Sequence, residues 1–581
     1  MDDIFEKNRK EWGERLALDE CFSSRSSAFS VYRQMAIMLS YGISLADILL
    51  GMGINRIKIY GYGEIGKLVV KNLDGKIEIV GIYDAKVTEK QLINGHMISP
   101  VSMLQNDDTL ILITPIDFCR SIACERIQAG YDRKKILSVR TLLTYGQQRI
   151  LHGNAFVYPI KTEQQYLITG AQFQNKGAQA MLFTAISEIR EKASNAIIWY
   201  LPVDQNDYYT EDIQKKYRFI ALLDGTDLRS QLFEICTGLT AIIDVGGYVL
   251  TSKWSPEFVI EYLRIARNYD IPIYFMPQSF GPLDYDDNTC EILRLLLPEA
   301  KLIFAREKDG YNQMQEKFHL QNMIQSIDLV LENKKLYLDR IYYDVKKPKK
   351  INIGNKNSVA IIPNIRTFEY GVHKGILSLY RIMIEKLLTM DKDIYIVAHS
   401  DDEAACCDIY SMFFCDERVN LIEEDLDCID FAEMMQSFEF AVVSRYHAAV
   451  QAYKKETPCI ILGWAEKYKE LAEYFEQSKY VMDVREEISS ATLISLLEGL
   501  DSNKVIEAEK IKMKLEHIPE ETCFNFLFDE IGEMFMINCN NTPKFYAAIS
   551  KNQEAVLDAS SGGVFWELCR IVINQGGVVF G

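Results

Sequence analysis

The chain has 581 residues, of which 48% are hydrophobic and 25% are charged. This balance is that of a globular protein, and it excludes disorder and fibrous repeats. Asp and Glu outnumber Lys and Arg by 82 to 64, and the net charge of −18 excludes a general nucleic-acid binder, because phosphate backbones call for a basic face.

Residues 1–50 are predicted to be helical, and residues 51–150 to form a small Rossmann-like α/β domain. In this domain a strand leads into a glycine-rich turn and a helix, and the next strand ends in an acid, which is the spacing of a dinucleotide-binding fold. The candidate residues for binding a nucleotide or NAD are Gly61, Gly63, Gly66 and Asp84. Alternatively, the glycines only permit close packing of the strand against the helix.

Strands and helices alternate again from about residue 166. Two α/β halves of a larger unit are predicted, over residues 160–345 and 355–500. A lysine-rich stretch, 333–357, is expected to be a solvated connector between them, with anchoring to acidic lipid as the other interpretation. Two such halves form a cleft between the carboxyl ends of two parallel sheets, where ligands of these folds bind.

Polar and glycine residues follow several predicted strands of the first of these halves. They are Asn175 and Gly177, Gly246 and Gly247, Gln278 and Ser279, and Arg306. Asn175 and Gly177 open a helix, whose N–H groups favour anions. Gln278 and Ser279 are expected to be exposed in a fixed turn. Gly246 and Gly247 could equally form a simple turn, and Arg306 a surface ion pair.

In the second half, Arg445 and His447 end one strand and begin a helix, and Lys467 follows the next strand. His447 could instead be a hydrogen-bonded helix cap, and His399 a packing residue. Because all these residues lie at carboxyl ends of strands, we expect them around one cleft. Two guanidinium groups and one imidazole suit a small substrate with a phosphate and a carboxylate, since Arg binds oxyanions bidentately and His can supply a proton.

The stretch from about 166 to 500 resembles the polysaccharide pyruvyl transferase family. The resemblance depends on several motifs in order: Asn175-Lys176-Gly177, Asp244-Val245-Gly246-Gly247, Pro277-Gln278-Ser279-Phe280-Gly281-Pro282, Ala305-Arg306-Glu307, Ser326-Ile327-Asp328, Ile362-Pro363-Asn364, Ser444-Arg445-Tyr446-His447-Ala448, and Thr457-Pro458 leading to Lys467. The chain departs from the usual family pattern at Ala178, where Asp is common, and at Tyr248, which shortens the glycine cluster.

This resemblance implies two Rossmann-like halves in a GT-B-like arrangement. It also implies transfer of a pyruvyl group from phosphoenolpyruvate to a sugar, with release of phosphate and formation of a pyruvate ketal. The implied roles are donor binding for Arg306 and Arg445 and acid catalysis for His447. No cofactor or metal is required for such a transfer.

Residues 540–581 are similar to the start of the coenzyme F420 hydrogenase/dehydrogenase beta-subunit family. The matching motifs are Tyr546-Ala547-Ala548, Ser560-Ser561-Gly562-Gly563-Val564-Phe565 and Gly576-Gly577-Val578-Val579-Phe580-Gly581. The flavin and iron–sulfur parts of that family do not follow, so we expect a truncated or remnant module without redox activity.

The expected partners are phosphoenolpyruvate and an oligosaccharide or lipid-linked glycan acceptor. No nucleic acid is expected. Thirteen Cys without a CxxC motif favour reduced thiols and a cytoplasmic protein, which the acceptor would bring to the inner face of the membrane as a peripheral protein. Two alternatives stay open: a GT-B glycosyltransferase that uses a sugar nucleotide, and an NAD-binding redox or sensor protein.

Overall fold

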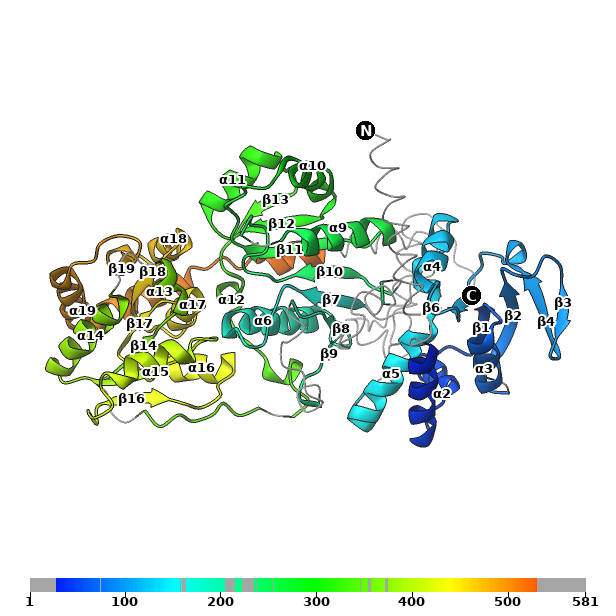
Figure 1. Ribbon diagram of the computed structural model, residues 1–581, viewed down its shortest axis with the longest axis horizontal. Coiled ribbons are helices and arrows are strands. Elements are labelled where there is room, and N and C mark those ends of the chain that lie inside the picture. The colour runs from blue at the N-terminus through cyan, green and yellow to red at the C-terminus, as the bar shows by residue number, and fades with distance from the viewer. Residues whose placement is uncertain are drawn as a thin grey trace, which may run out of the picture. The chain divides into compact units, whose positions relative to one another are not determined.

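The structure is a computed structural model that describes residues 28–529, apart from 74, 157, 159–163, 204–214, 222–234, 237, 254, 345, 354–356 and 371–374. Three mostly parallel sheets with flanking helices follow one another along the chain (Figure 1). The predicted α/β fold class is therefore confirmed. All three sheets lie in one compact unit that ends at Phe524. The tail predicted over 540–581, like residues 1–27, lies outside the described residues.

The first sheet has the strand order β3-β4-β2-β1-β5-β6, and only β3 runs antiparallel to its neighbour. Its strands are β1 (Arg56–Tyr60), β2 (Glu78–Asp84), β3 (Gln91–Ile93), β4 (His96–Pro100), β5 (Leu110–Ile113) and β6 (Ile136–Ser138). Its named helices are α2 (Leu45–Gly51), α3 (Glu64–Leu73), α4 (Cys119–Gln128) and α5 (Val139–His152). Strand β5, between β1 and β6, is buried along its whole length, which is typical of a parallel strand covered on both faces.

The second sheet is parallel throughout, with the order β13-β12-β11-β10-β7-β8-β9. Its strands are β7 (Gln165–Thr169), β8 (Ile197–Tyr200), β9 (Ile220–Ala221), β10 (Ala241–Asp244), β11 (Ile273–Gln278), β12 (Leu302–Ala305) and β13 (Met323–Gln325). Its named helices are α6 (Lys176–Lys192), α9 (Glu257–Tyr269), α10 (Asp287–Leu296), α11 (Lys308–Phe318) and α12 (Leu329–Glu332).

The third sheet is also parallel, with the order β16-β15-β14-β17-β18-β19. Its strands are β14 (Ser358–Ile362), β15 (Asp393–Val397), β16 (Val419–Ile422), β17 (Phe440–Val443), β18 (Cys459–Gly463) and β19 (Val481–Asp483). Its helices are α13 (Ile365–Tyr370), α14 (Ile376–Thr389), α15 (Glu403–Ser411), α16 (Cys428–Met435), α17 (Tyr446–Lys454), α18 (Lys467–Tyr474) and α19 (Ser490–Glu516).

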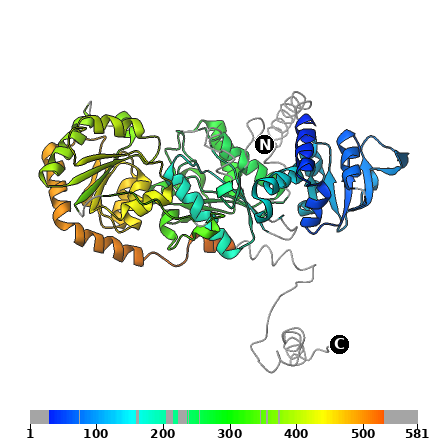
Figure 2. The ribbon, with the colours of Figure 1, turned by 90° about the horizontal axis from the view of Figure 1, so that it is seen from below.

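Helix α19 is the longest described helix, with 27 residues, and it packs against α14 (orange in Figure 2). Leu493, Leu497 and Leu500 are fully buried on it, at the spacing that places side chains on one helix face. Ser489 caps its first turn by accepting the backbone N–H of Thr492. The apolar stripe thus fixes the first half of the helix on the third sheet, and Glu507 and Ile511 are buried in its second half.

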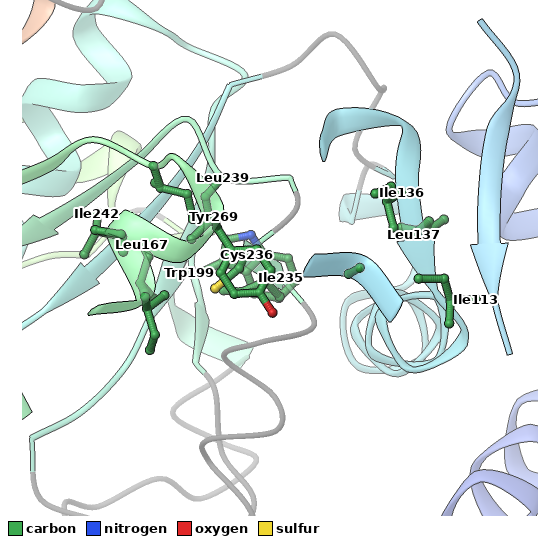
Figure 3. Packing of buried hydrophobic residues seen from close by; sticks show 14 of the residues in the cluster. Ile113, Ile136, Leu137, Leu167, Trp199, Ile235, Cys236, Leu239, Ile242 and Tyr269 are labelled. Carbon is green, nitrogen blue, oxygen red and sulfur yellow. The ribbon is translucent and has the colours of Figure 1, made fainter. Parts of the chain in front are cut away.

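Side chains of the first and second sheets belong to one buried apolar cluster, part of which Figure 3 shows. Ile113, Ile136 and Leu137 come from the first sheet, and Trp199 comes from the second. The Tyr145 ring of α5 lies 5.7 Å from the Trp199 ring, between centroids. Burial of such large rings stabilises the contact between the two sheets.

The lysine-rich connector is solvated only in part: Lys334, Lys335, Lys347, Lys349 and Lys350 are exposed, as predicted, whereas Lys346 pairs with acids of the second α/β half. The Lys346 ammonium binds Asp427 and lies 3.1 Å from Asp430. The backbone N–H of Lys349 donates to Asp430 at 2.8 Å. At the start of the stretch, Asn333 is 3% exposed. The charge of Lys346 is therefore paired within the protein, although the sequence analysis expected it to face solvent or acidic lipid.

Within the described residues, no single helix has the length and apolar content to cross a bilayer. Helices Ala28–Ser40 and Leu45–Gly51 pass such a test only as a pair, and they are bent by 75° relative to each other.

Candidate functional site

The candidate site lies where the strand order reverses in the second and third sheets. There β7 pairs with β10, and β14 pairs with β17, although neither pair is consecutive in the chain. Ligands of α/β sheets bind outside the carboxyl ends of strands at such positions. Asn175 and Gly177 follow β7, Gly247 follows β10, and Arg445 and His447 follow β17. The residues chosen from the sequence therefore gather where a ligand is expected.

Arg306 follows β12, and its side chain is only 3% exposed. Its Nε donates to Glu307 at 2.7 Å, and its Nη1 donates to Asp328 at 2.9 Å. Its Nη2 donates to Ser279 Oγ and, at 3.4 Å, to the Gly247 carbonyl. Although burial alone would lower the pKa of Arg306, the carboxylates of Glu307 and Asp328 raise it. The guanidinium is permanently charged, and most of its donors are used inside the protein.

Gln278 and Ser279 are buried, at 0% and 5% exposed, so the expectation that they are exposed is wrong. The reason is that β11 extends through Gln278 and pairs there with Ala305 of β12. Ser279 Oγ donates to Glu307 at 2.9 Å. The Gln278 amide is buried without a hydrogen-bond partner among the described residues. Ser279 thus supports the Arg306 network.

The carboxylate of Asp244 stabilises the Asp-Val-Gly-Gly turn, residues 244–247, that follows β10. Asp244 Oδ1 accepts the backbone N–H of Gly246 at 2.9 Å, and burial raises the pKa of Asp244 to about 6. A Cβ added at Gly246 would lie 2.4 Å from the Val249 side chain. The Gly247 carbonyl accepts the N–H of Ser279 at 3.0 Å. These glycines bring the turn close to its neighbours and leave the Gly247 carbonyl facing Arg306.

Asn175 is the N-cap of α6, and its Oδ1 accepts the N–H groups of Gly177 at 3.0 Å and Ala178 at 3.3 Å. A Cβ added at Gly177 would lie 2.4 Å from the His447 ring. Glycine is therefore needed because an imidazole from the third sheet packs against the first turn of this helix. The Asn-Lys-Gly motif begins the helix and makes room for His447.

His447 lies in the first turn of α17, and its side chain is 12% exposed. Its Nε2 is buried and lies 3.5 Å from Asp328 Oδ2. Gly177 flanks the ring, and a Cβ at Gly247 would lie 3.6 Å from its Cε1. Burial lowers the pKa of His447, and the Asp328 carboxylate opposes that shift.

Arg445 is the N-cap residue of α17 and is held by two neighbouring acids. Its Nε and Nη2 donate to Asp402 at 2.7 and 2.6 Å, and its Nη2 lies 3.2 Å from Asp401. The intervening Tyr446 ring lies 4.2 Å from the Arg306 guanidinium, measured to the ring centroid. The segment 445–447 therefore contacts the Arg306 network through a cation–π interaction and through Asp328.

Lys467 begins α18, and burial lowers its pKa to about 7, with the Arg306 charge as a second cause. Its ammonium lies 5.0 to 6.0 Å from the centroids of four aromatic rings: Tyr248, Tyr446, Trp464 and Tyr468. Within the described part of the chain, no carboxylate forms an ion pair with it. Arg306 and Arg445 have acidic partners, whereas Lys467 has none there, so it is suited to an anionic ligand.

Direct contacts join the second and third sheets beside these residues. Glu470 of α18 accepts the backbone N–H groups of Lys308 at 2.7 Å and Asp309 at 3.2 Å, and so caps α11. The Lys454 ammonium of α17 donates to the Val330 carbonyl at 2.6 Å. The cap fixes the helix that begins with Lys467 against the helix that follows Arg306.

The glycine-rich turn of the first sheet is shaped by close backbone contact. Gly61 has a φ of +97°, and a Cβ at Gly66 would lie 2.3 Å from the Gly61 carbonyl oxygen. Space is open beside Gly63. The first and third glycines thus permit the strand–helix packing that the sequence offered as the alternative to nucleotide binding.

Asp84 ends β2, as the sequence indicated, and its carboxylate is used by the backbone. One oxygen accepts the N–H of Tyr62 at 2.7 Å, and the other accepts the N–H of Lys86 at 2.8 Å. The acid therefore ties the glycine-rich turn to the end of the neighbouring strand. Binding of a nucleotide there stays a prediction.

Sequence reasoning missed the roles of Asp328 and Asp402. The sequence analysis named Asp328 only as part of the Ser326-Ile327-Asp328 motif, yet it contacts both Arg306 and His447. Asp402 was not singled out, although it is fully buried against Arg445. Their position after strands β13 and β15 was the available signal. Over the described residues, no group of three or more His, Cys, Asp or Glu is placed to hold a metal ion.

A family model described as "Polysaccharide pyruvyl transferase" matches residues 175–466, which is half of the chain. The chain belongs to the polysaccharide pyruvyl transferase family. Arg306, Arg445 and His447 fall inside the segment that matches the pyruvyl transferase model, and Lys467 follows it directly. Membership of this transferase family makes the protein an enzyme by class. A comparison with curated proteins finds no sequence match.

Solved structures similar to this pyruvyl transferase family member include three with low sequence identity. UDP-GlcNAc 2-epimerase from Methanocaldococcus jannaschii has a TM-score of 0.41 and 13% identity, over 58% of this chain and 92% of that chain. UDP-GlcNAc 2-epimerase from Neisseria meningitidis has a TM-score of 0.41 and 11% identity, over 64% and 100%. An O-GlcNAc transferase mutant from Thermobaculum terrenum has a TM-score of 0.37 and 11% identity, over 72% and 77%.

Proposed function

We propose that the protein transfers a pyruvyl group from phosphoenolpyruvate to two hydroxyls of a sugar, forming a pyruvate ketal and releasing phosphate. Family membership supports the class of reaction. The single observation that carries the choice of an anionic donor is Lys467, a cation without an acidic partner among the described residues, beside Arg306 and between the second and third sheets. A bound phosphate or carboxylate would provide the missing counter-charge.

The cations around Lys467 have different tasks in this proposal. Arg306 and Arg445 are fixed by buried carboxylates, so they supply positive charge with little freedom to move. Lys467 keeps its ammonium donors for the ligand. Preorganised charges of this kind stabilise charge that develops in a transition state, because they need no reorganisation during the reaction.

His447 is the proposed acid. Burial lowers the pKa of His447. A bound donor would add negative charges beside the ring and raise that pKa, so the imidazole would gain its proton as the donor binds. The acid would thus be charged mainly when the substrate is present.

The proposed reaction is balanced as follows. His447 gives a proton to the methylene carbon of phosphoenolpyruvate, and the central carbon becomes cationic. One sugar hydroxyl attacks that carbon and loses its proton. The carbon–oxygen bond to phosphate then breaks, and the second hydroxyl closes the ketal. The second hydroxyl proton leaves with the phosphate, while the first restores the acid. Positioned proton transfer contributes about 10²–10⁴-fold to such rates.

The acceptor is proposed to be a cell-surface glycan or its lipid-linked precursor, made at the inner face of the membrane. The test is to incubate the protein with phosphoenolpyruvate and a panel of free and lipid-linked oligosaccharides. Mass spectrometry should detect a sugar that has gained pyruvate with loss of water, together with inorganic phosphate. Transfer of a sugar from a nucleotide donor, with release of a nucleoside diphosphate and no pyruvylated product, would contradict the proposal.

A further inference from the structure

Asp328 is the carboxylate that links the Arg306 network to His447, and no role was predicted for it from the sequence. It follows β13 and is 2% exposed. Its Oδ1 accepts the backbone N–H of Val330 at 2.9 Å, which fixes the side chain. Its Oδ2 lies 2.9 Å from Arg306 Nη1 and 3.5 Å from His447 Nε2. One oxygen atom therefore faces both groups.

The two ring nitrogens of His447 have different surroundings. Nε2 is buried, so the exposed 12% of the side chain belongs to other atoms; Asp328 Oδ2 lies 3.5 Å from it, at the limit of hydrogen-bond distance and without the geometry of a formed hydrogen bond. Nδ1 belongs to the ring edge that packs near Gly177, at the first turn of α6. A carboxylate beside one nitrogen of an imidazole favours the tautomer with the proton on that nitrogen, and it sets the orientation of the ring.

We propose that Asp328 is a positioning residue that holds the proton on Nε2 of His447 and leaves Nδ1 as the nitrogen that exchanges a proton with the substrate. The role in catalysis rests on the proposed function, whereas the tautomer and the ring orientation do not. Asp328 acts through His447 and does not itself contact the donor in this scheme.

The charges that face His447 come from several elements. Asp328 at the end of β13 raises its pKa, while Arg306 at the end of β12 and Lys467 at the start of α18 lower it. The buried ring of His399, after β15, interacts with it as well. Asp328 is the one carboxylate within ion-pair distance of His447 among the residues that the structure describes. Its removal therefore leaves the imidazole facing cations alone.

Glu307 provides a matched control for Asp328. Its carboxylate is also buried, at 6% exposed, and also binds Arg306, through Nε at 2.7 Å. No contact joins it to His447 in the described structure. Asp328→Asn and Glu307→Gln each remove one buried negative charge from Arg306, but only the first removes the partner of His447.

The first experiment is nuclear magnetic resonance of the full chain, without ligand, labelled with ¹⁵N and ¹³C in histidine. The chain has seven His, and the signals of His447 are assigned from their loss in His447→Gln. At high pH the unmodified protein should show the proton on Nε2. A proton on Nδ1 would overturn the proposal without any change at Asp328, so the test survives even if Asp328→Asn fails to fold.

The second experiment titrates His447 in the two matched variants. We expect a lower pKa for His447 in Asp328→Asn than in Glu307→Gln. Equal values in both variants would show that Asp328 acts only through the overall charge and would refute the inference.

A kinetic experiment tests the same pairing in the working enzyme. The basic limb of the pH profile of kcat should move to lower pH in Asp328→Asn, with about a tenfold loss of kcat above that limb. If no pyruvyl transfer is found but the titration agrees, the proposed function fails while the pairing of Asp328 with His447 stands.

Discussion

Lys467 offers the sharpest test of the proposed donor site, because its charge can be removed or made permanent. Lys467→Met keeps the length and apolar stem of the side chain and removes the ammonium. Lys467→Arg keeps a positive charge at all accessible pH values, since guanidinium does not lose its proton in proteins. Lys469→Met serves as the control, because Lys469 is two positions along the same helix and already pairs with Glu466 at 3.3 Å.

The expected rise in the donor KM follows from the ion-pair partner that Lys467 lacks among the described residues. A hydrogen bond to a charged group contributes about 1.5–3 kcal/mol when the ligand supplies the partner. A tenfold change in affinity corresponds to about 1.4 kcal/mol, so Lys467→Met should raise the KM for phosphoenolpyruvate by about 10- to 150-fold. Lys469→Met should leave that KM within about twofold, because Lys469 is itself exposed and its charge is already paired with Glu466 and Asp483.

The pH dependence of donor binding is a second test of the role of Lys467. Burial lowers the pKa of Lys467 to about 7, so the free site loses its ammonium as the pH rises through that value. Donor affinity should then fall by up to about tenfold for each pH unit above 7, because binding must recover a proton. In Lys467→Arg the part of this slope that comes from Lys467 should vanish, and only the smaller dependence from proton uptake by His447 should remain. A donor KM that does not change in Lys467→Met, or the same slope in the arginine variant, would refute the assignment of the donor anion to Lys467.

Stability should change in the opposite direction to affinity. The pKa of Lys467 in the folded protein lies below that of an exposed lysine, so the charged ammonium opposes folding. This penalty is complete below pH 7 and disappears as the pH rises toward the ordinary lysine value of 10.5. Lys467→Met should therefore raise the Tm, and by more at about pH 6 than at about pH 9. An equal or lower Tm in differential scanning calorimetry would contradict the picture of a partly buried cation without an ion-pair partner among the described residues.

Other expected outcomes concern packing and the first sheet. Gly177→Ala adds a Cβ 2.4 Å from the His447 ring, so it should cost about 1–3 kcal/mol in urea unfolding and lower kcat; wild-type values of both would contradict the packing. Glu470→Ala removes the cap on α11 and should cost about 0.5–2 kcal/mol, whereas Glu473→Ala, at an exposed site on the same helix, should cost little. If NAD(H) binds the first sheet, it should raise the Tm, and Gly63→Asp should abolish that rise without affecting pyruvyl transfer.

Much of the fold was accessible from the sequence, because parallel strands covered on both faces appear as short apolar runs. Strand β14, Ser358–Ile362, is such a run and is buried at every position. Three short edge strands, β9, β13 and β19, had too few residues to show a pattern. The hairpin of β3 and β4 was also missed, since its residues are partly exposed and their alternation is weak.

The functional residues were found to the extent that their position after a strand identifies them. Arg306, Arg445 and His447 were chosen for that reason, and the structure brings them to neighbouring loops. Gln278 was placed wrongly at the surface, because the sequence could not show that β11 continues through it. Asp328 and Asp402 were overlooked as partners, since an acid after a strand has no distinctive local signal.

The succession of strands and helices, the α/β class and the family are evident from the sequence, because these depend on local periodicity and on motifs of a few neighbouring residues. Which charges are paired is evident only once the chain is folded. Arg306 meets Asp328 and Arg445 meets Asp402 across many intervening residues, while Lys467 is left among aromatic rings. Coulomb interactions depend on distance in space and on burial, and neither is encoded in the spacing of residues along the chain.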